Sequence, residues 1–244
     1  MRFVDSHLHL EGPGASSEIT RSEASGTLLL ACGVDRKSSM TTIHIASSNP
    51  TVKAFVGVHP SEALKEGSLA WVRDSLRTAT GLGEVGLDPK YSAIGPKSAQ
   101  AKVFQGQLAE AKRAGKPIQV HSRGAETECL DALDDSGLQR VLMHWFQSEE
   151  SLPRVLDHGY FVSFGPSLVY SKRLQRIAAR CPTSHVLTET DFPVSYDPLE
   201  KARGPSLIPS VVFSLAEVWG IPFEEARVVT TQNAMRFLGS SEKG

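Results

Sequence analysis

The sequence of 244 residues lacks several features that would place it in a specialised class of protein. Its three cysteines, Cys32, Cys129 and Cys181, are too few and too widely spaced for a disulfide framework or a Cys-x-x-Cys metal site, and their dispersal is typical of a reducing compartment. No apolar run reaches the length of about 18 residues that a membrane-spanning helix needs. The first residues contain no apolar signal segment. We therefore expect a cytoplasmic protein without a membrane association.

An excess of charge of one sign is also absent. Lysine and arginine total 26, aspartate and glutamate total 27, and the formal net charge is −1. This balance argues against a protein that coats nucleic acid or a membrane through bulk charge, although it leaves room for a local basic patch. No heptad or apolar patch predicts an oligomer, so the oligomeric state cannot be read from the sequence and a monomer is compatible with it.

Strand and helix patterns alternate along the chain, which is typical of parallel α/β architecture. The apolar run at 27–34 predicts a buried strand, and the apolar stripe at 97–114 predicts a helix that ends at Gly115. Residues 11–17, rich in glycine and serine, are expected to form a loop. The first expected strand begins at Phe3, and the other seven cover residues 27–34, 53–60, 81–88, 117–122, 140–145, 160–165 and 184–191. The expected helices cover 37–48, 68–79, 97–114, 126–135, 148–158 with Ser148 as N-cap, 171–180, 206–219 and 223–237.

These alternating units, with no linker or composition shift between them, predict one α/β domain over residues 1–244. The expected fold is a (β/α)8 TIM barrel, whose usual length is about 250 residues. A doubly wound open sheet is the alternative. It normally carries a glycine-rich phosphate loop after its first strand, and residues 11–14 lack that glycine spacing.

Histidines and carboxylates gather where the expected strands end. Alternate residues of a strand point to one face, so the two histidines of residues 5–9 would stand side by side; taken alone, they are equally compatible with satisfied polar residues. In such a barrel the active site lies at the C-terminal ends of the strands. The residues expected there are His7, His9, His59, Glu84, His121, His144 and Asp191. His44, His158 and His185 fall elsewhere and are interpreted as structural or surface residues.

Four imidazoles and two carboxylates are costly to bury together unless a cation pairs with them. Six ligands exceed the three or four protein ligands of a single catalytic zinc, and they suit two divalent ions about 3.5–4 Å apart that share a carboxylate. Glu84 is the expected bridge. Zinc, manganese or nickel would accept such a histidine-rich site, whereas magnesium prefers oxygen ligands. In this interpretation His7, His9 and Asp191 complete one site, and His121 and His144 the other.

The motifs that contain these residues resemble, in order from residue 3 to residue 238, those of the TatD family of metal-dependent hydrolases in the amidohydrolase superfamily. They lie at residues 4–9, 57–60, 83–88, 117–123, 141–146, 187–193 and 233–238. The resemblance implies a β/α barrel, a divalent-metal site and deoxyribonuclease or 3′–5′ exonuclease activity. Three departures concern loops near the substrate: Pro89 and Lys90 precede Tyr91 where the family has aromatic residues, Trp145 replaces a small residue or cysteine, and Gln147-Ser148 replaces Ser-Gly.

The expected mechanism uses a water activated between two cations as the nucleophile. Asp191 is the candidate general base, Glu84 the catalytic bridge, and His59 a donor to a substrate oxygen. Arg123 is a candidate phosphate clamp or, alternatively, part of a surface salt bridge. Asp5 and Glu189 are expected to support ligands or to form internal ion pairs. Lys90, Lys172 and Arg173 are either contacts for a nucleic-acid backbone or solvated charges.

Three functions are compatible with this pattern. The first is a metal-dependent phosphodiesterase that acts on DNA ends. The second is a related metallohydrolase for a small lactone, amide or phosphoester; some relatives of that kind use a carboxylated lysine as the bridge, and the fourth strand offers Glu84 and no lysine. The third is a non-enzymatic scaffold, which the complete ligand set disfavours.

Overall fold

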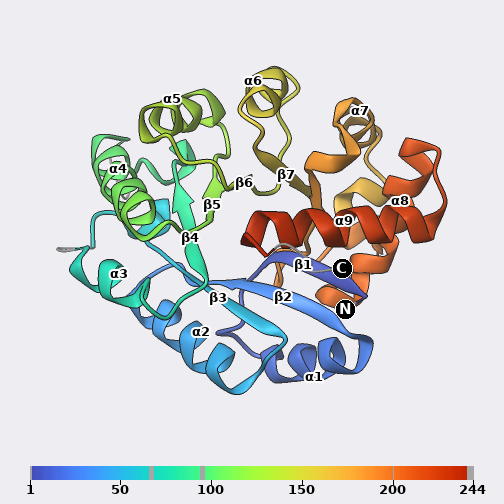
Figure 1. Cartoon of the computed structure of the whole chain (residues 1–244), viewed down its shortest axis with the longest axis horizontal. Helices are drawn as coiled ribbons and strands as arrows, with labels where there is room; N and C mark the ends of the chain where they lie inside the picture. Colours follow the sequence, from blue (N-terminus) through green and yellow to red (C-terminus); the bar gives the residue numbers. More distant parts are fainter. Residues whose placement is uncertain (1, 66–68, 94–96, 200, 241–244) are drawn as a thin grey trace.

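Eight parallel strands follow one another around a single sheet in the order of the sequence (Figure 1). The computed structural model describes residues 2–65, 69–93, 97–199 and 201–240. The strands are β1 (Phe3–Leu8), β2 (Thr27–Cys32), β3 (Val52–Val56), β4 (Gly81–Gly86), β5 (Ile118–His121), β6 (Val141–Met143), β7 (Phe161–Phe164) and β8 (Val186–Thr188). The helices are α1 (Ala15–Ser25), α2 (Arg36–Ser48), α3 (Ala70–Ser75), α4 (Lys97–Ala114), α5 (Glu126–Ser136), α6 (Leu152–Asp157), α7 (Lys172–Arg180), α8 (Ile208–Trp219) and α9 (Phe223–Leu238).

The last strand lies beside the first, so the sheet curls into a nearly closed barrel. The Thr188 hydroxyl donates to the carbonyl of Val4 at 2.7 Å. Just beyond β8, the Asp191 N–H donates to the carbonyl of His7 at 2.9 Å, and the His9 N–H donates to the carbonyl of Phe192 at 2.7 Å. These bonds confirm the predicted TIM barrel and exclude an open sheet. They also hold Asp191 against the strand that carries His7 and His9.

Alternation along the strands separates the interior of the barrel from the layer between strands and helices. In β2, Leu28 and Leu30 pack in the same cluster as Phe55, whereas Leu29 and Ala31 pack in a different cluster with the α1 residue Ile19. A strand with period-two side chains produces this division. Both faces of β2 are buried, which explains its uninterrupted apolar sequence.

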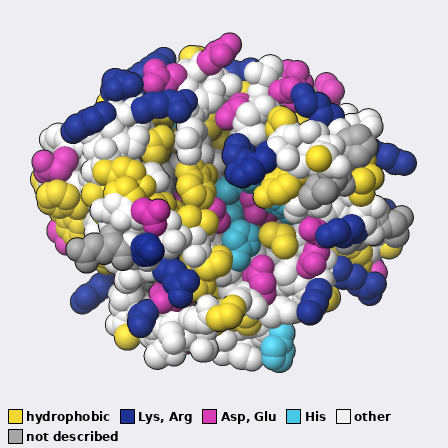
Figure 2. All heavy atoms as spheres, turned by 180° about the vertical axis from the view of Figure 1, so that it is seen from behind, with side chains coloured by type: hydrophobic (Ala, Val, Ile, Leu, Met, Phe, Trp, Pro, Cys, Tyr) yellow, Lys and Arg dark blue, Asp and Glu magenta, His cyan; other side chains and the backbone are white. Residues whose placement is uncertain are grey.

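Helix α9 crosses one end of the barrel and closes it (Figure 1). Phe237 is fully buried there, with its ring 5.9 Å from that of Phe55 and 6.0 Å from that of Phe161. The Asn233 amide donates to the carbonyls of Thr183 and Val186 at 2.7 and 2.8 Å and so ties α9 to the start of β8. Seen from behind, the opposite end is hollowed and shows histidines at its centre (Figure 2). The C-terminal motif therefore has a structural role at the end away from the histidines.

Three local expectations were wrong. Residues 15–17 belong to α1 rather than to a loop. The sequence did not indicate this helix because only two of its four buried residues, Ala15 and Ile19, are apolar, while Glu18 and Ser22 are polar. Helix α6 begins at Leu152, and the Ser148 hydroxyl instead accepts from the Ser151 N–H in the preceding turn. Helix α3 is shorter than the expected 68–79, and Ser68 lies outside the described residues.

In the described part of the chain, no single helix is long and apolar enough to cross a membrane. The segments Pro205–Trp219 and Phe223–Leu238 reach that length and composition only as a pair, with a bend of 110° between them.

Candidate metal centre

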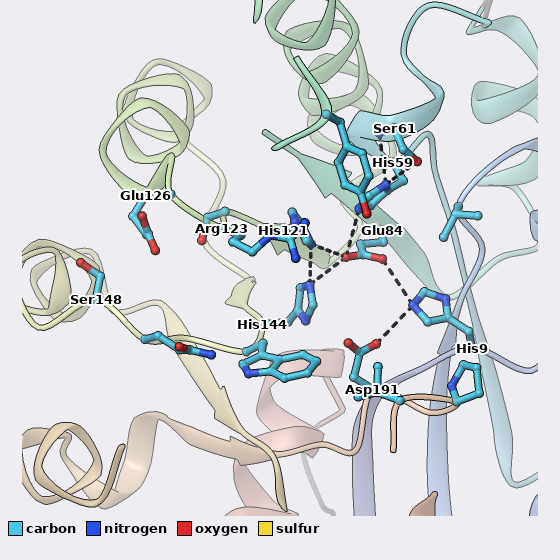
Figure 3. Close-up of a pocket in the computed structure, with 18 of the residues that line it drawn as sticks. His9, His59, Ser61, Glu84, His121, Arg123, Glu126, His144, Ser148 and Asp191 are labelled. Atoms are coloured by element: carbon cyan, nitrogen blue, oxygen red, sulfur yellow. Dashed lines mark hydrogen bonds and ion pairs between the residues drawn. The ribbon is translucent and has the colours of Figure 1, made fainter. Parts of the chain in front are cut away.

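The six expected metal ligands converge at the C-terminal end of the barrel. Figure 3 shows His9, His121, His144 and Asp191 around Glu84; His7 lies 3.7 Å from the same carboxylate. His7 lies in β1 and His9 directly follows it, His121 ends β5, and His144 and Asp191 follow β6 and β8. Glu84 extends from β4 between them. The barrel thus brings together residues that lie up to 184 positions apart in sequence, through nothing more than the common direction of its strands.

One oxygen of Glu84 faces the histidines of the first strand. Glu84 Oε2 lies 3.7 Å from His7 Nε2 and 3.4 Å from His9 Nε2, and Asp191 Oδ1 lies 3.6 and 3.4 Å from the same two nitrogens. These separations are too long for good hydrogen bonds. They are close to the spacing of about 3.3–3.6 Å between ligand atoms that surround a tetrahedral cation at about 2.0–2.2 Å. The four side chains could therefore hold one metal ion.

The other oxygen faces a second set of imidazoles. Glu84 Oε1 lies 2.7 Å from His121 Nδ1 and 2.8 Å from His144 Nε2, and these two nitrogens are 3.3 Å apart. His59 Nε2 is 3.7 Å from the same oxygen. Each carboxylate oxygen thus has its own group of nitrogens, which is the arrangement expected of a bridging carboxylate.

Hydrogen bonds on the outer ring nitrogens of three histidines direct the inner nitrogens at the carboxylates of the site. His7 Nδ1 donates to Gln119 Oε1 at 2.6 Å, and this oxygen also accepts from the Cys32 thiol. His9 Nδ1 donates to the Cys32 carbonyl at 2.9 Å. His121 Nε2 donates to Asp88 Oδ2 at 2.7 Å. A ring that donates through one nitrogen in its neutral form offers a lone pair at the other, which is the form that binds metals.

His59 has the opposite arrangement. Its Nδ1 accepts a hydrogen bond from the Ser61 N–H at 3.2 Å, so the proton of the neutral ring lies on Nε2, which is directed at the Glu84 side of the site. Burial lowers the pKa of His59 to about 4. At neutral pH this residue is therefore a neutral hydrogen-bond donor and differs from the ligand histidines.

The charges of the site are strongly coupled. Burial alone would raise the pKa of Glu84, but the imidazoles around it hold that pKa well below its ordinary value. Burial disfavours protonation of His144, yet the adjacent Glu84 carboxylate raises its pKa to about 10. Burial lowers the pKa of His7, whose Nε2 is buried and makes no hydrogen bond to any residue that the structure describes. A buried, unpaired nitrogen among carboxylates is what a metal ligand requires.

Comparison with known proteins shows to which family the chain belongs. The family model described as TatD related DNase matches residues 4–239. The chain belongs to the TatD family. Over 252 residues it is 28% identical to the uncharacterized metal-dependent hydrolase YabD of Bacillus subtilis, covering 97% of this chain and 98% of that protein. Over 258 residues it is 28% identical to the human deoxyribonuclease TATDN3, covering 97% and 94%. The crystal structure of YJJV, a TatD homolog from Escherichia coli, superposes with a TM-score of 0.89 at 22% identity over 98% of this chain and 99% of that one.

Membership of the TatD family makes this protein a metal-dependent hydrolase, as the sequence motifs predicted. The number and identity of the metal ions are not fixed by that membership. The predicted ligands nevertheless fit such ions, because their lone pairs, their spacing and the unpaired His7 nitrogen all converge on Glu84.

A cavity of about 830 Å³ opens above the predicted ligand residues. The loops that depart from the usual TatD motifs border it: Tyr91, Trp145, Gln147 and Ser148 all line the cavity. Arg173 also lines it and donates to the carbonyl of Gln147 at 2.8 Å. The departures therefore lie where a substrate would bind, and they leave the ligand set unchanged.

Only some of the residues predicted to contact substrate line the cavity. Arg123 lines the cavity and its Nη2 lies 2.6 Å from Asp88 Oδ2, so it forms an ion pair there, and its contact with a phosphate stays a prediction. Lys90 is exposed and is not among the lining residues; Tyr91, its neighbour, is. Lys172 is exposed and bonds to Gln175.

Two residues that support the predicted ligands were not predicted from the sequence. Asp88 and Gln119 each form a hydrogen bond with a predicted ligand histidine, and both stand in recognised motifs. Gln119 could have been noticed, because it lies two residues before His121 and so points to the same face of a buried strand. Of the residues expected to support ligands, Asp5 accepts from the Thr190 N–H at 2.9 Å, and Glu189 Oε2 lies 3.8 Å from His144 Nδ1.

Proposed function

We propose that this protein is a divalent-metal-dependent phosphodiesterase that removes nucleotides from the 3′ ends of DNA. The observation that carries the proposal is the position of Glu84, whose two oxygens face two separate groups of ligand atoms at the base of an open cavity. Paired cations on a shared carboxylate suit phosphoryl chemistry. The human relative that is named a deoxyribonuclease supports the same substrate class.

In this proposal His7, His9, Asp191 and Glu84 would hold a first ion, and His121, His144 and Glu84 would hold a second. When bound, the ions would lower the pKa of a water molecule and neutralise charge on a phosphoryl oxygen. The ions can be zinc, manganese, nickel or magnesium.

Three side chains are proposed to act on the attacking water or on the substrate. Asp191, whose side chain is 13% exposed at the cavity, accepts the proton of the attacking water. Its backbone adopts a left-handed conformation with φ of 48°, fixed by the bond from its N–H to His7, as is common for strained residues at functional sites. His59 donates from Nε2 to a substrate oxygen, in line with its protonation. Arg123 binds a phosphate while Asp88 holds its guanidinium in place.

Cleavage of a single-stranded oligonucleotide tests the proposal. Removal of metal by a chelator should abolish cleavage, re-addition of manganese or zinc should restore it, and His9→Ala should lack activity. His44→Ala, on an exposed position of α2, is the matched control and should behave as the unaltered protein. Full cleavage after complete metal removal would refute the proposal.

The second candidate is hydrolysis of a small lactone, amide or phosphoester. The neutralisation of Arg123 by Asp88 favours it, because a paired guanidinium attracts a phosphate less than a free one. A substrate panel of an oligonucleotide, an aryl phosphodiester, lactones and amides separates the two. Activity on lactones or amides alone would replace the first proposal with the second.

A further inference from the structure

The cavity wall next to His144 is aromatic. Trp145 follows that ligand directly and lines the cavity, and its side chain is only partly buried. Its backbone is left-handed, with φ of 44°. This conformation is unfavourable for a bulky residue and persists only where the surroundings enforce it. The backbone conformation of Trp145 thus holds its side chain at the wall of the cavity.

A fixed support lies against the indole ring of Trp145. The ring of Tyr196 is 6.2 Å from it, tilted by 38°. Tyr196 is buried, its hydroxyl donates to the carbonyl of Thr190 at 2.7 Å, and its N–H donates to the carbonyl of Ala202 at 3.1 Å. Because Thr190 precedes the ligand Asp191, the indole and the proposed metal site share one rigid support.

Cationic groups stand beside this aromatic wall. Arg173 and Arg123 both line the cavity, and Arg123 stacks over the ring of Tyr91 at 5.6 Å. Tyr91 in turn lies edge-on to His59, with ring centroids 5.5 Å apart. An aromatic face next to guanidinium groups is the combination that binds single-stranded nucleic acid, because the rings stack on bases and the cations contact phosphates.

From this arrangement we infer that Trp145 is a specificity-determining residue that stacks on the 3′-terminal base of a single-stranded substrate. The inference rests on the proposed function and adds to it the part of the substrate that is recognised. Because Trp145 lines the same cavity as His144, Glu84 and Asp191, a base stacked on the indole would bring its sugar and phosphate toward the predicted ligand cluster. Stacking does not depend on base identity, so the site accepts any terminal base but disfavours a terminus without one.

Two oligonucleotides test this inference: one ends in a 3′ thymidine, and the other ends in an abasic tetrahydrofuran residue at the same position. For Trp145→Ala, KM for the thymidine-ended strand should rise by about 5- to 150-fold, which corresponds to the ~1–3 kcal/mol of one base–aromatic stack, while kcat stays within about twofold. KM for the abasic strand should be the same in the unaltered protein and in Trp145→Ala. Trp145→Phe retains an aromatic face and should restore most of the difference between the two strands.

A binding measurement on metal-free protein makes the result independent of catalysis. Short oligothymidine should quench tryptophan fluorescence in the unaltered protein, and the quenching should disappear in Trp145→Phe, which keeps Trp71 and Trp219. Equal metal content and equal melting temperature establish that the variants are folded. If Trp145→Ala raises KM equally for both strands, or if quenching persists in Trp145→Phe, the inference is wrong. Absence of any phosphodiester cleavage by the unaltered, metal-loaded protein would instead refute the proposed function.

Discussion

Asp88 offers a sharp test of how the second proposed metal site is built. Its carboxylate is 1% exposed and accepts from His121 Nε2 at 2.7 Å, from Arg123 Nε at 2.9 Å and from the Lys90 N–H at 2.8 Å. Burial alone would raise the pKa of Asp88, but the bonds from His121 and Arg123 outweigh it and lower the pKa to about 2. The carboxylate is thus charged at neutral pH and fixes the proton of His121 on Nε2.

The substitution Asp88→Asn keeps the shape and removes the charge. An amide can turn its NH2 group toward His121, which then carries its proton on Nδ1, the nitrogen that faces Glu84. Loss of such an orienting partner costs about 10- to 100-fold in metal affinity or activity, or ~1.4–2.7 kcal/mol. We therefore expect one of two bound ions to weaken by that factor, while the ion held by His7 and His9 is unaffected.

Calorimetric titration of metal-free protein with zinc or manganese measures this effect for each ion. Arg123→Met is the matched control, because it removes the other partner of Asp88 and leaves the His121 bond intact. It should bind both ions normally and show a raised KM for an oligonucleotide. If Asp88→Asn binds both ions with unchanged affinity, Asp88 does not set the protonation of His121 and the reasoning fails.

Three further predictions concern stability and the role of His59. Phe237→Ala should lower the free energy of unfolding by about 3–5 kcal/mol in urea titrations, and Phe213→Ala, 57% exposed on α8, by less than about 0.5 kcal/mol. The hydrogen bond from Arg73 lowers the pKa of Glu110. The charged Glu110 carboxylate therefore stabilises the fold above the unfolded-state pKa of about 4.3, and this contribution is lost as pH falls through the lowered pKa. Glu110→Gln should therefore destabilise by about 1 kcal/mol at neutral pH and by less below about pH 4; an equal effect at both would contradict the sign. His59→Ala should lower kcat without changing metal content, and loss of one ion would show that His59 is a ligand.

The convergence of the candidate ligand residues could be predicted from the sequence because each lies in or closely after a buried strand, and parallel strands of a barrel end at the same face. The supporting contacts could not. The hydrogen bond that His121 donates to Asp88 spans 33 positions and the one that His7 donates to Gln119 spans 112, so no local sequence pattern indicates them. The helix α1 escaped prediction for a different reason: it buries few apolar side chains, and periodicity in sequence reflects burial rather than hydrogen bonding.

The same residue type has different roles in this site, and the partner on the outer nitrogen decides which. His7 and His9 each donate outward to an oxygen, so the inner nitrogen carries a lone pair suited to a cation. His59 accepts outward from a backbone N–H, so its inner nitrogen carries a proton suited to a substrate oxygen. The acceptors for His7 and His9, Gln119 and Cys32, lie in the strands β5 and β2. The donor to His59, Ser61, lies in the turn Pro60–Glu62 that follows β3. A substitution at Gln119 should therefore act on metal binding, whereas one in the turn at Ser61 should act on substrate, although neither residue needs to touch the reacting atoms.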